Sequence, residues 1–354
     1  MIPARQSEAL MTLTAREIEV VRIIVQAYIE HAAPVGSRYV AKQSTLKLSA
    51  ASMRNIMADL TEKGYLHQPY TSAGRVPTDK AFRFYVDTVL SPALLPENTQ
   101  QDIKEALGQA GLEFSNILEH ASKLISAQSS QVGVAVAPKR SMIRLKRIDL
   151  VLVRTGLVMA IAIFNGGVVH NKLLPVEPKV TADDLVKYAN YLNEKFQDRT
   201  IEEIKKDILQ EMEQAENRFN ALYAKALSLA RDAFANNNDR EVFLDGTLNV
   251  LDHLEGKDVS SMRDLLEFLE HRSSLLELVD KLASNEGLIV TFGTEFYGPE
   301  LGQWGLISSP YQVQGQKLGV VGTIGPIHMD YSRLMPMVDT IAKMLSDLLE
   351  SRFA

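Results

Sequence analysis

The residues with the most informative chemistry lie close together near the N-terminus, in the run 51–55. Arginine can donate two hydrogen bonds to a guanine edge, asparagine can pair with an adenine, and a small methyl group can pack against a thymine methyl. Arg54, Asn55 and Ala51 supply these three kinds of contact. At about 100° per residue they share one side of a helix, with Ser52 at its margin. The spacing predicts readout of base edges in the major groove of DNA.

These side chains need a helix that presents them outward. Ser49 predicts its N-cap, and Gly64 predicts its end just after Lys63. Apolar residues recur at i, i+3, i+4 and i+7 on the other side, which predicts a buried stripe. The members of this stripe are Met53, Ile56, Met57 and Leu60.

Two helices and a flap are expected around this third helix. Thr14 and Glu17 form a capping-box pattern ahead of a first helix that stops before Pro34. Ser37 is expected to cap a short second helix, Arg38–Gln43. Two extended runs, 65–70 and 75–77, flank the turn 71–74, and Thr78 is expected to cap a fourth helix. Three helices followed by a strand–turn–strand flap predict a winged helix-turn-helix.

The charge distribution supports the same interpretation. The whole chain has a net charge of −6, but residues 34–85 carry eight basic and three acidic side chains. Such a local basic surplus suits a phosphate backbone. The alternatives are an ordinary solvated charge run, a structural three-helix module, or a flap that contacts protein. Arg38, Lys42 and Arg75 are expected to contact phosphates or the minor groove. The predicted DNA-binding residues are Arg38, Lys42, Ser49, Ala51, Ser52, Arg54, Asn55 and Arg75.

The remaining chain predicts an α+β arrangement in several domains. Residues 91–96 read as a boundary, 99–130 as mostly helical, and 132–175 as a β-meander with turns at Thr155-Gly156 and Asn165-Gly166. A helical block follows before strands return, which suggests an insertion within a sheet domain. The expected limits are 1–95, 96–177, 178–255 and 256–354. Further helices are expected over 260–283 and 331–353. A stripe that needs a partner helix, in this subunit or another, comprises Ile208, Met212, Ala215, Phe219, Leu222 and Ala226.

Catalytic classes find little support. The 354 residues include no cysteine, and the seven histidines form no HxxxH or HxH pair. No GxSxG elbow or Walker A loop is present, so no enzyme activity, metal or cofactor is expected. No apolar stretch approaches the roughly 20 residues that span a bilayer, so a cytoplasmic protein without membrane contact is expected. Trp304 and Tyr311 could line a ligand pocket or simply fill a core.

Several longer motifs resemble the HrcA family of bacterial heat-inducible transcription repressors. The motifs resemble its second helix, recognition helix, wing with fourth helix, and a signature near the C-terminus. In this sequence they are Pro34–Arg38; Met53–Leu60 with Gly64–Leu66; Thr71–Lys80 with Phe82–Asp87; and Gly325-Pro326 with Met329–Arg333. His328 stands where an arginine is expected, and residues 319–324 depart from the usual sequence of the family. Both departures concern the C-terminal part.

The resemblance implies an N-terminal winged helix-turn-helix, then a GAF-like α/β domain carrying a mostly helical inserted dimerisation domain. It implies a homodimer that binds an inverted-repeat operator of chaperone operons and is released on heat stress. It also implies support of the active form by a GroEL-type chaperonin. Phe219 and Leu222 are expected to contribute to dimerisation. The alternative is a ligand-gated transcription regulator that senses a small molecule through the GAF-like domain.

Overall fold

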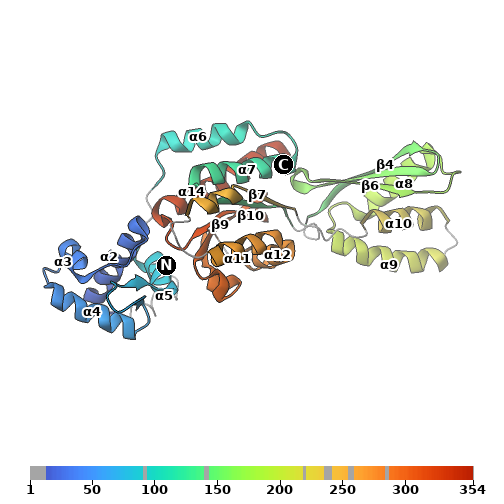
Figure 1. Ribbon diagram of the computed structural model, residues 1–354. Coiled ribbons are helices and arrows are strands. Elements are labelled where there is room, and N and C mark those ends of the chain that lie inside the picture. The colour runs from blue at the N-terminus through green and yellow to red at the C-terminus, as the bar shows by residue number, and fades with distance from the viewer. Residues whose placement is uncertain are drawn as a thin grey trace.

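The computed structural model describes residues 13–90, 94–138, 143–217, 221–234, 241–253, 259–283 and 287–353. Figure 1 shows three units in a row: an N-terminal unit (13–90), a central unit built on a five-stranded sheet, and an outer lobe (143–234). Within these residues, no helix combines the length and apolar character needed to cross a membrane. The mixed α and β architecture agrees with the sequence prediction.

The N-terminal unit follows from its local signals. Thr14 and Glu17 form the expected capping box, and buried Met53, Met57 and Leu60 hold the third helix against the first. The two short strands pair antiparallel as a flap. Its elements are α2 Ala15–His31, α3 Ser37–Gln43, α4 Ala50–Glu62, β1 Leu66–His67, β2 Val76–Pro77, α5 Asp79–Phe84 and the π-helical turn η1 Tyr85–Val89.

Two expected helix caps differ from the structure. The N-cap of α3 is Gly36, so Ser37 is already the first helical residue and makes no capping bond. Thr78 is the N-cap of α5, but its hydroxyl does not cap the helix. The Thr78 Oγ1 instead donates to the carbonyl oxygens of Gly64 at 2.8 Å and Tyr65 at 3.0 Å. A tertiary contact thus displaces the local capping bond, and it joins the start of α5 to the end of α4.

The central unit is a five-stranded antiparallel sheet in the order β7-β3-β10-β9-β8. Side chains alternate between its two faces: Ala135 and Val321 pack in the core with α7 and α14, whereas Val134 and Val320 pack with α11 and α12. Its longer elements are α6 Glu97–Gly108, α7 Phe114–Ser129, β3 Val132–Val136, β7 Val242–Asp245, α11 Val259–Glu270, α12 Arg272–Ala283, β8 Ile289–Phe292, β9 Trp304–Val313, β10 Gln316–Pro326 and α14 Tyr331–Phe353. The short helices are η4 Thr247–His253, α13 Gly293–Phe296 and η5 Pro299–Leu301.

The outer lobe contains its own three-stranded sheet, in the order β4-β5-β6. This is the predicted meander, and helices α8 and α10 pack against it. Its elements are β4 Leu145–Arg154, β5 Leu157–Phe164, η3 Asn165–Gly167, β6 Val169–Pro175, α8 Ala182–Phe196, α9 Ile201–Asn217 and α10 Ala221–Phe234.

The domain limits expected from the sequence differ from this arrangement. The limit between 177 and 178 falls inside the outer lobe, because the meander packs with the lobe helices and not with the five-stranded sheet. Conversely, β7 lies in the expected insertion but pairs with β3 of the central sheet. Turn signals define hairpins, but they carry no information on which sheet a hairpin joins.

Two helices expected to be continuous are divided. The stripe from Ile208 to Ala226 spans α9 and α10, which pack against each other within the subunit. The helix expected over 260–283 breaks at His271 into α11 and α12. The spacing of apolar residues alone did not distinguish one long helix from two shorter ones.

Candidate nucleic-acid interface

Helix α4 presents its polar side as the sequence predicts. The Ser49 side chain accepts a hydrogen bond from the Ser52 backbone N–H at 3.2 Å and fixes the first turn. Ala51, Arg54 and Asn55 are exposed, and Ser52 is half-buried. The three side chains chosen for base contacts therefore share an accessible surface on the first half of α4.

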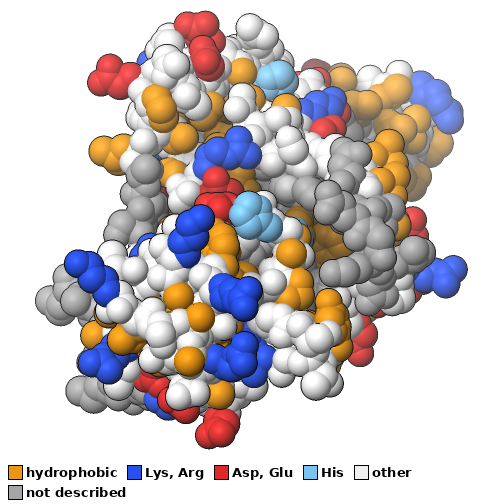
Figure 2. All heavy atoms as spheres, turned by 60° about the vertical axis from the view of Figure 1, so that its left-hand side comes forward, with side chains coloured by type: hydrophobic (Ala, Val, Ile, Leu, Met, Phe, Trp, Pro, Cys, Tyr) orange, Lys and Arg blue, Asp and Glu red, His pale blue; other side chains and the backbone are white. Residues whose placement is uncertain are grey.

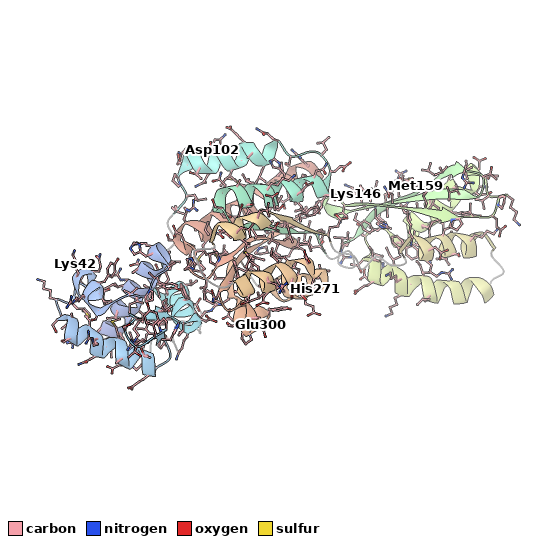
Figure 3. The ribbon with its side chains drawn as sticks, viewed as in Figure 1. Lys42, Asp102, Lys146, Met159, His271 and Glu300 are labelled. Atoms are coloured by element: carbon pink, nitrogen blue, oxygen red, sulfur yellow. The ribbon has the colours of Figure 1, made fainter. Side chains whose placement is uncertain are left out.

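Exposed cations lie on α3, on α4 and in the connection between them. Arg38 and Lys42 on α3, Lys47 in the α3–α4 connection and Arg54 on α4 are exposed, and the described part of the chain offers none of them an acidic partner within ion-pair distance. We call these four residues the basic face. Lys42 lies on the side of the N-terminal unit that points away from the central unit (Figure 3). Figure 2 shows Lys and Arg side chains spread over the forward surface of the N-terminal unit, in the lower half of the view.

Several other cations of the N-terminal unit are neutralised, which sets the basic face apart. Lys63 Nζ donates to Glu17 Oε1 at 2.7 Å, and Arg22 Nε donates to Glu19 Oε2 at 2.9 Å. The hydrogen bond from Arg22 lowers the pKa of the Glu19 carboxyl, against a smaller opposing effect of burial. Positive charge thus remains uncompensated where a polyanion could reach α3 and α4.

Arg75 has structural contacts that the sequence did not predict. Its backbone pairs with Val35 through two hydrogen bonds of 2.9 Å, and its Nε donates to Thr61 Oγ1 at 3.0 Å. The side chain is half-buried between the flap and the end of α4. Arg75 therefore attaches the flap to the helix bundle, and any contact with phosphate would add to this role.

Sequence reasoning missed two parts of this surface. Lys47 adopts a left-handed backbone with φ of 51° in the connection before α4, and it stands beside the first turn as an exposed cation. At the flap, Gln68 Nε2 donates to the carbonyl oxygens of Thr71 and Ala73, and Tyr70 is 62% exposed. The position of Lys47 next to the Ser49 cap was a usable signal in the sequence.

The residues predicted for dimerisation are placed only in part. Phe219 lies outside the described residues, and for Leu222 the structure describes the α10 backbone but not the side chain. Elsewhere in the outer lobe, the side of the meander away from α8 and α10 exposes apolar side chains, with Arg147, Asp149 and Asn171 on the same side. We call these apolar residues the outer sheet face; they are Val151, Val153, Met159, Ile161, Ile163, Val169 and Leu173.

The two aromatic residues considered for a ligand pocket have structural contacts. Tyr311 is fully buried, and its hydroxyl donates to the Val136 carbonyl oxygen at 2.8 Å. Trp304 Nε1 lies 3.0 Å from Ser261 Oγ and 3.1 Å from its carbonyl oxygen, to which it donates. Within the described ranges, no group of three or more His, Asp or Glu side chains is arranged to hold a metal ion.

Comparison with known proteins identifies the family of this chain. The family model "HrcA protein C terminal domain" matches residues 115–335. A heat-inducible transcription repressor HrcA from Nitratidesulfovibrio vulgaris (strain Miyazaki F) is 41% identical over 97% of this chain and 98% of its own length. The repressor of the same name from Syntrophobacter fumaroxidans is 37% identical over 96% and 98% of the two chains. A solved structure, "Crystal structure of a hypothetical protein at 2.2 A resolution", shares the fold with a TM-score of 0.58 and 22% identity, covering 96% of this chain and all of its own.

These relatives place the chain in the class of bacterial transcription repressors. It belongs to the HrcA family, as the motifs near both ends of the sequence predicted.

Proposed function

We propose that this chain is a homodimeric repressor that binds the inverted-repeat operator of chaperone operons through a winged helix-turn-helix. As a member of the HrcA family, it is a negative regulator of heat-shock gene transcription. The proposal assigns α4 to the major groove, with Arg54 and Asn55 at base edges and Ala51 against a thymine methyl. It includes no catalytic activity and no cofactor.

The observation that carries this proposal is the basic face. A cation that is already paired gains little from a phosphate, whereas an unpaired one releases counterions from the DNA on binding. Arg38, Lys42 and Lys47 flank the α4 side chains assigned to bases, so phosphate contacts would set the register of the helix in the groove. A helix fits the major groove, which is about 12 Å wide.

Homodimerisation is the second part of the proposal. Two recognition helices related by a twofold axis read matching half-sites in opposite directions, so a symmetric dimer requires an inverted repeat. The outer sheet face supports it, since Val151, Val153, Val169 and Leu173 are 48–58% exposed. Contiguous apolar surface of this kind marks an interaction site. Phe219 and Leu222 remain the residues predicted from the sequence.

We assign the central unit to the GAF-like domain and the outer lobe to the inserted dimerisation domain. The heat response then needs no ligand. If a GroEL-type chaperonin maintains the folded dimer, occupancy falls when misfolded proteins occupy that chaperonin. For the alternative of a ligand-gated regulator, Tyr311 gives no support, because it is fully buried and bonded to Val136. Trp304 lines a cleft, but its Nε1 is already bonded to Ser261.

The test is a titration of the full-length protein into a labelled inverted-repeat operator and a scrambled duplex, at two salt concentrations and two temperatures. We expect operator preference of about 10³ or more, lost on mild heating and restored by chaperonin. Equal, salt-sensitive binding to both duplexes would reduce the proposal to a generic DNA module. A small molecule that raises the melting temperature and changes operator affinity in a saturable way would favour the ligand-gated alternative.

A further inference from the structure

The N-terminal and central units meet through α5. Arg83 Nε donates to Glu295 Oε1 at 3.1 Å, and Arg83 Nη2 contacts the second carboxylate oxygen. Arg83 Nη1 donates to the Val290 carbonyl oxygen at 2.8 Å, and its guanidinium lies 4.6 Å from the ring centre of Phe292. Beside this pair, Thr294 Oγ1 donates to Asp79 Oδ2 at 2.6 Å. We call the Arg83–Glu295 and Asp79–Thr294 contacts the junction.

An aromatic cluster forms the floor of the junction. The ring centres of Phe82 and Phe292 are 6.3 Å apart, and those of Phe82 and Tyr331 are 6.4 Å apart. Tyr331 is fully buried, and its hydroxyl donates to the Ile327 carbonyl oxygen at 2.6 Å. Ring contacts of this kind tolerate small rotations, whereas a bidentate ion pair fixes direction. The polar contacts therefore select one orientation among those that the cluster allows.

The orientation of α5 is passed directly to the recognition helix. Thr78, the N-cap of α5, donates from its hydroxyl to Gly64 and Tyr65, just after the end of α4. Glu295 is itself held, because the Phe292 backbone N–H donates to its Oε2 at 2.9 Å. A continuous set of hydrogen bonds thus links the central unit to α4.

A small rotation at the junction would be amplified along the length of α4. At 1.5 Å per residue, the 13 residues of α4 span about 20 Å. A tilt of about 10° displaces the far end of such a lever by about 3.5 Å, close to the rise of one base pair. A cleft of about 1220 Å³, lined by residues of both units that include Tyr28 and Trp304, leaves space beside the junction for such a tilt.

We propose that the junction sets the half-site spacing that the dimer accepts, with Arg83, Glu295, Asp79 and Thr294 as positioning residues. The inference rests on the proposed function, since it requires a dimer on an inverted repeat. These contacts join the N-terminal unit to the central unit, and the Arg83–Glu295 pair is bidentate, so they suit the control of orientation between the two units.

The experiment measures binding of the full-length protein to operators whose central spacer is changed one base pair at a time. The variants are Glu295→Gln, Thr294→Val and the double substitution. Glu119→Gln is the matched control, because Glu119 forms an exposed ion pair with Lys123 on α7, at 2.7 Å, outside the junction. Sedimentation measures whether each variant is a dimer. A duplex with one half-site measures the affinity of a single α4 for DNA, independent of spacing.

We expect the wild type and Glu119→Gln to prefer one spacing over its neighbours by about tenfold or more, a difference of about 1.4 kcal/mol. Glu295→Gln and the double variant should flatten this preference to about threefold or less while half-site affinity and the dimer are unchanged. A preference that survives in the folded double variant, or a wild type indifferent to spacing, would overturn the inference alone. Failure of the wild type to distinguish any inverted repeat from scrambled DNA would overturn the proposed function as well.

Discussion

Gly74 lies directly against the backbone of Val35. A Cβ atom built on Gly74 would stand 2.4 Å from the Val35 carbonyl oxygen and 2.8 Å from its nitrogen. This close approach allows the neighbouring Arg75 to exchange two backbone hydrogen bonds with Val35. The flap is therefore tied to the segment between α2 and α3, and the glycine of the family-like turn motif has a steric reason.

Gly74→Ala should destabilise the N-terminal unit. The added methyl group meets backbone atoms that cannot rotate away, so we expect a loss of about 1–3 kcal/mol in the free energy of unfolding. Chemical denaturation followed by circular dichroism measures it. Gly108→Ala is the control, since a Cβ at Gly108, the last residue of α6, meets nothing within 4 Å. An unchanged midpoint for Gly74→Ala would mean that the flap can move away from Val35.

Local signals sufficed for the first and third helices of the N-terminal unit, α2 and α4. Helix boundaries there depend on capping residues and on one buried stripe, and both lie within the same short segment of sequence. The Thr14–Glu17 capping box and the Ser49 cap of α4 are therefore confirmed. The C-terminal helix Tyr331–Phe353 matches its expected limits for the same reason.

Features that depend on distant partners were not predictable. Thr78 bonds to Gly64 and Tyr65, and Arg75 bonds to Thr61, because folding brings these groups together. The position of the meander in the outer lobe likewise depends on which helices cover it. The Arg83–Glu295 contact, between residues 212 positions apart, leaves no trace in the local sequence.

Arg54→Ala and Asn55→Ala should each weaken operator binding by about 1–3 kcal/mol and relax specificity at one base pair. Both side chains are exposed on the first half of α4, so the folded state should be unaffected. Fluorescence anisotropy at fixed salt measures the affinity. The exposed Arg16 of α2 provides the control substitution Arg16→Ala. Unchanged operator affinity for Arg54→Ala would contradict the assignment of α4 to the major groove.

Lys47→Gln and Arg75→Ala should distinguish a residue that contributes only charge to DNA binding from one that also stabilises the fold. Lys47 makes no ion pair with the described residues, so its loss should weaken operator and scrambled duplex alike and reduce the salt slope by about one, with stability unchanged. Arg75→Ala should also weaken binding to both duplexes, but with a lower midpoint of unfolding, because Thr61 loses the hydrogen bond from Arg75. If Arg75 reaches phosphate, Thr61→Val should lower the midpoint of unfolding but leave the affinity for both duplexes unchanged. A stable Arg75→Ala protein would contradict the attachment of the flap through this side chain.

Met159→Asp should convert the proposed dimer into monomers with weak operator binding. Met159 pairs across the strands with Val151 and Leu173, at the centre of the outer sheet face, and a charge there opposes burial against a second copy. Sedimentation velocity measures the mass. Asn190→Asp, exposed on α8, is the control on the covered side of the lobe. If only charges at Phe219 and Leu222 dissociate the dimer, the interface lies on that helical stripe.

Glu17 makes the stability of the N-terminal unit depend on pH. Burial raises the pKa of its carboxyl, but hydrogen bonds from Lys63 and Thr14 outweigh this effect and hold the pKa below its ordinary value of 4.5. A carboxyl with a lowered folded-state pKa stabilises the fold above its unfolded pKa and loses that contribution as pH falls through the folded value. Glu17→Gln should therefore cost about 0.5–2 kcal/mol at neutral pH, the range of a lost helix cap.

The difference in unfolding free energy between wild type and Glu17→Gln should shrink as pH falls below 4.5, and denaturation midpoints from neutral pH to about pH 3 measure it. Glu62→Gln, exposed at the end of α4, makes the same change in net charge and should leave the pH dependence as in the wild type. A difference that stays constant across this range would assign the contribution of Glu17 to neutral capping bonds. In that case the 2.7 Å contact with Lys63 would add no charge-dependent contribution to stability.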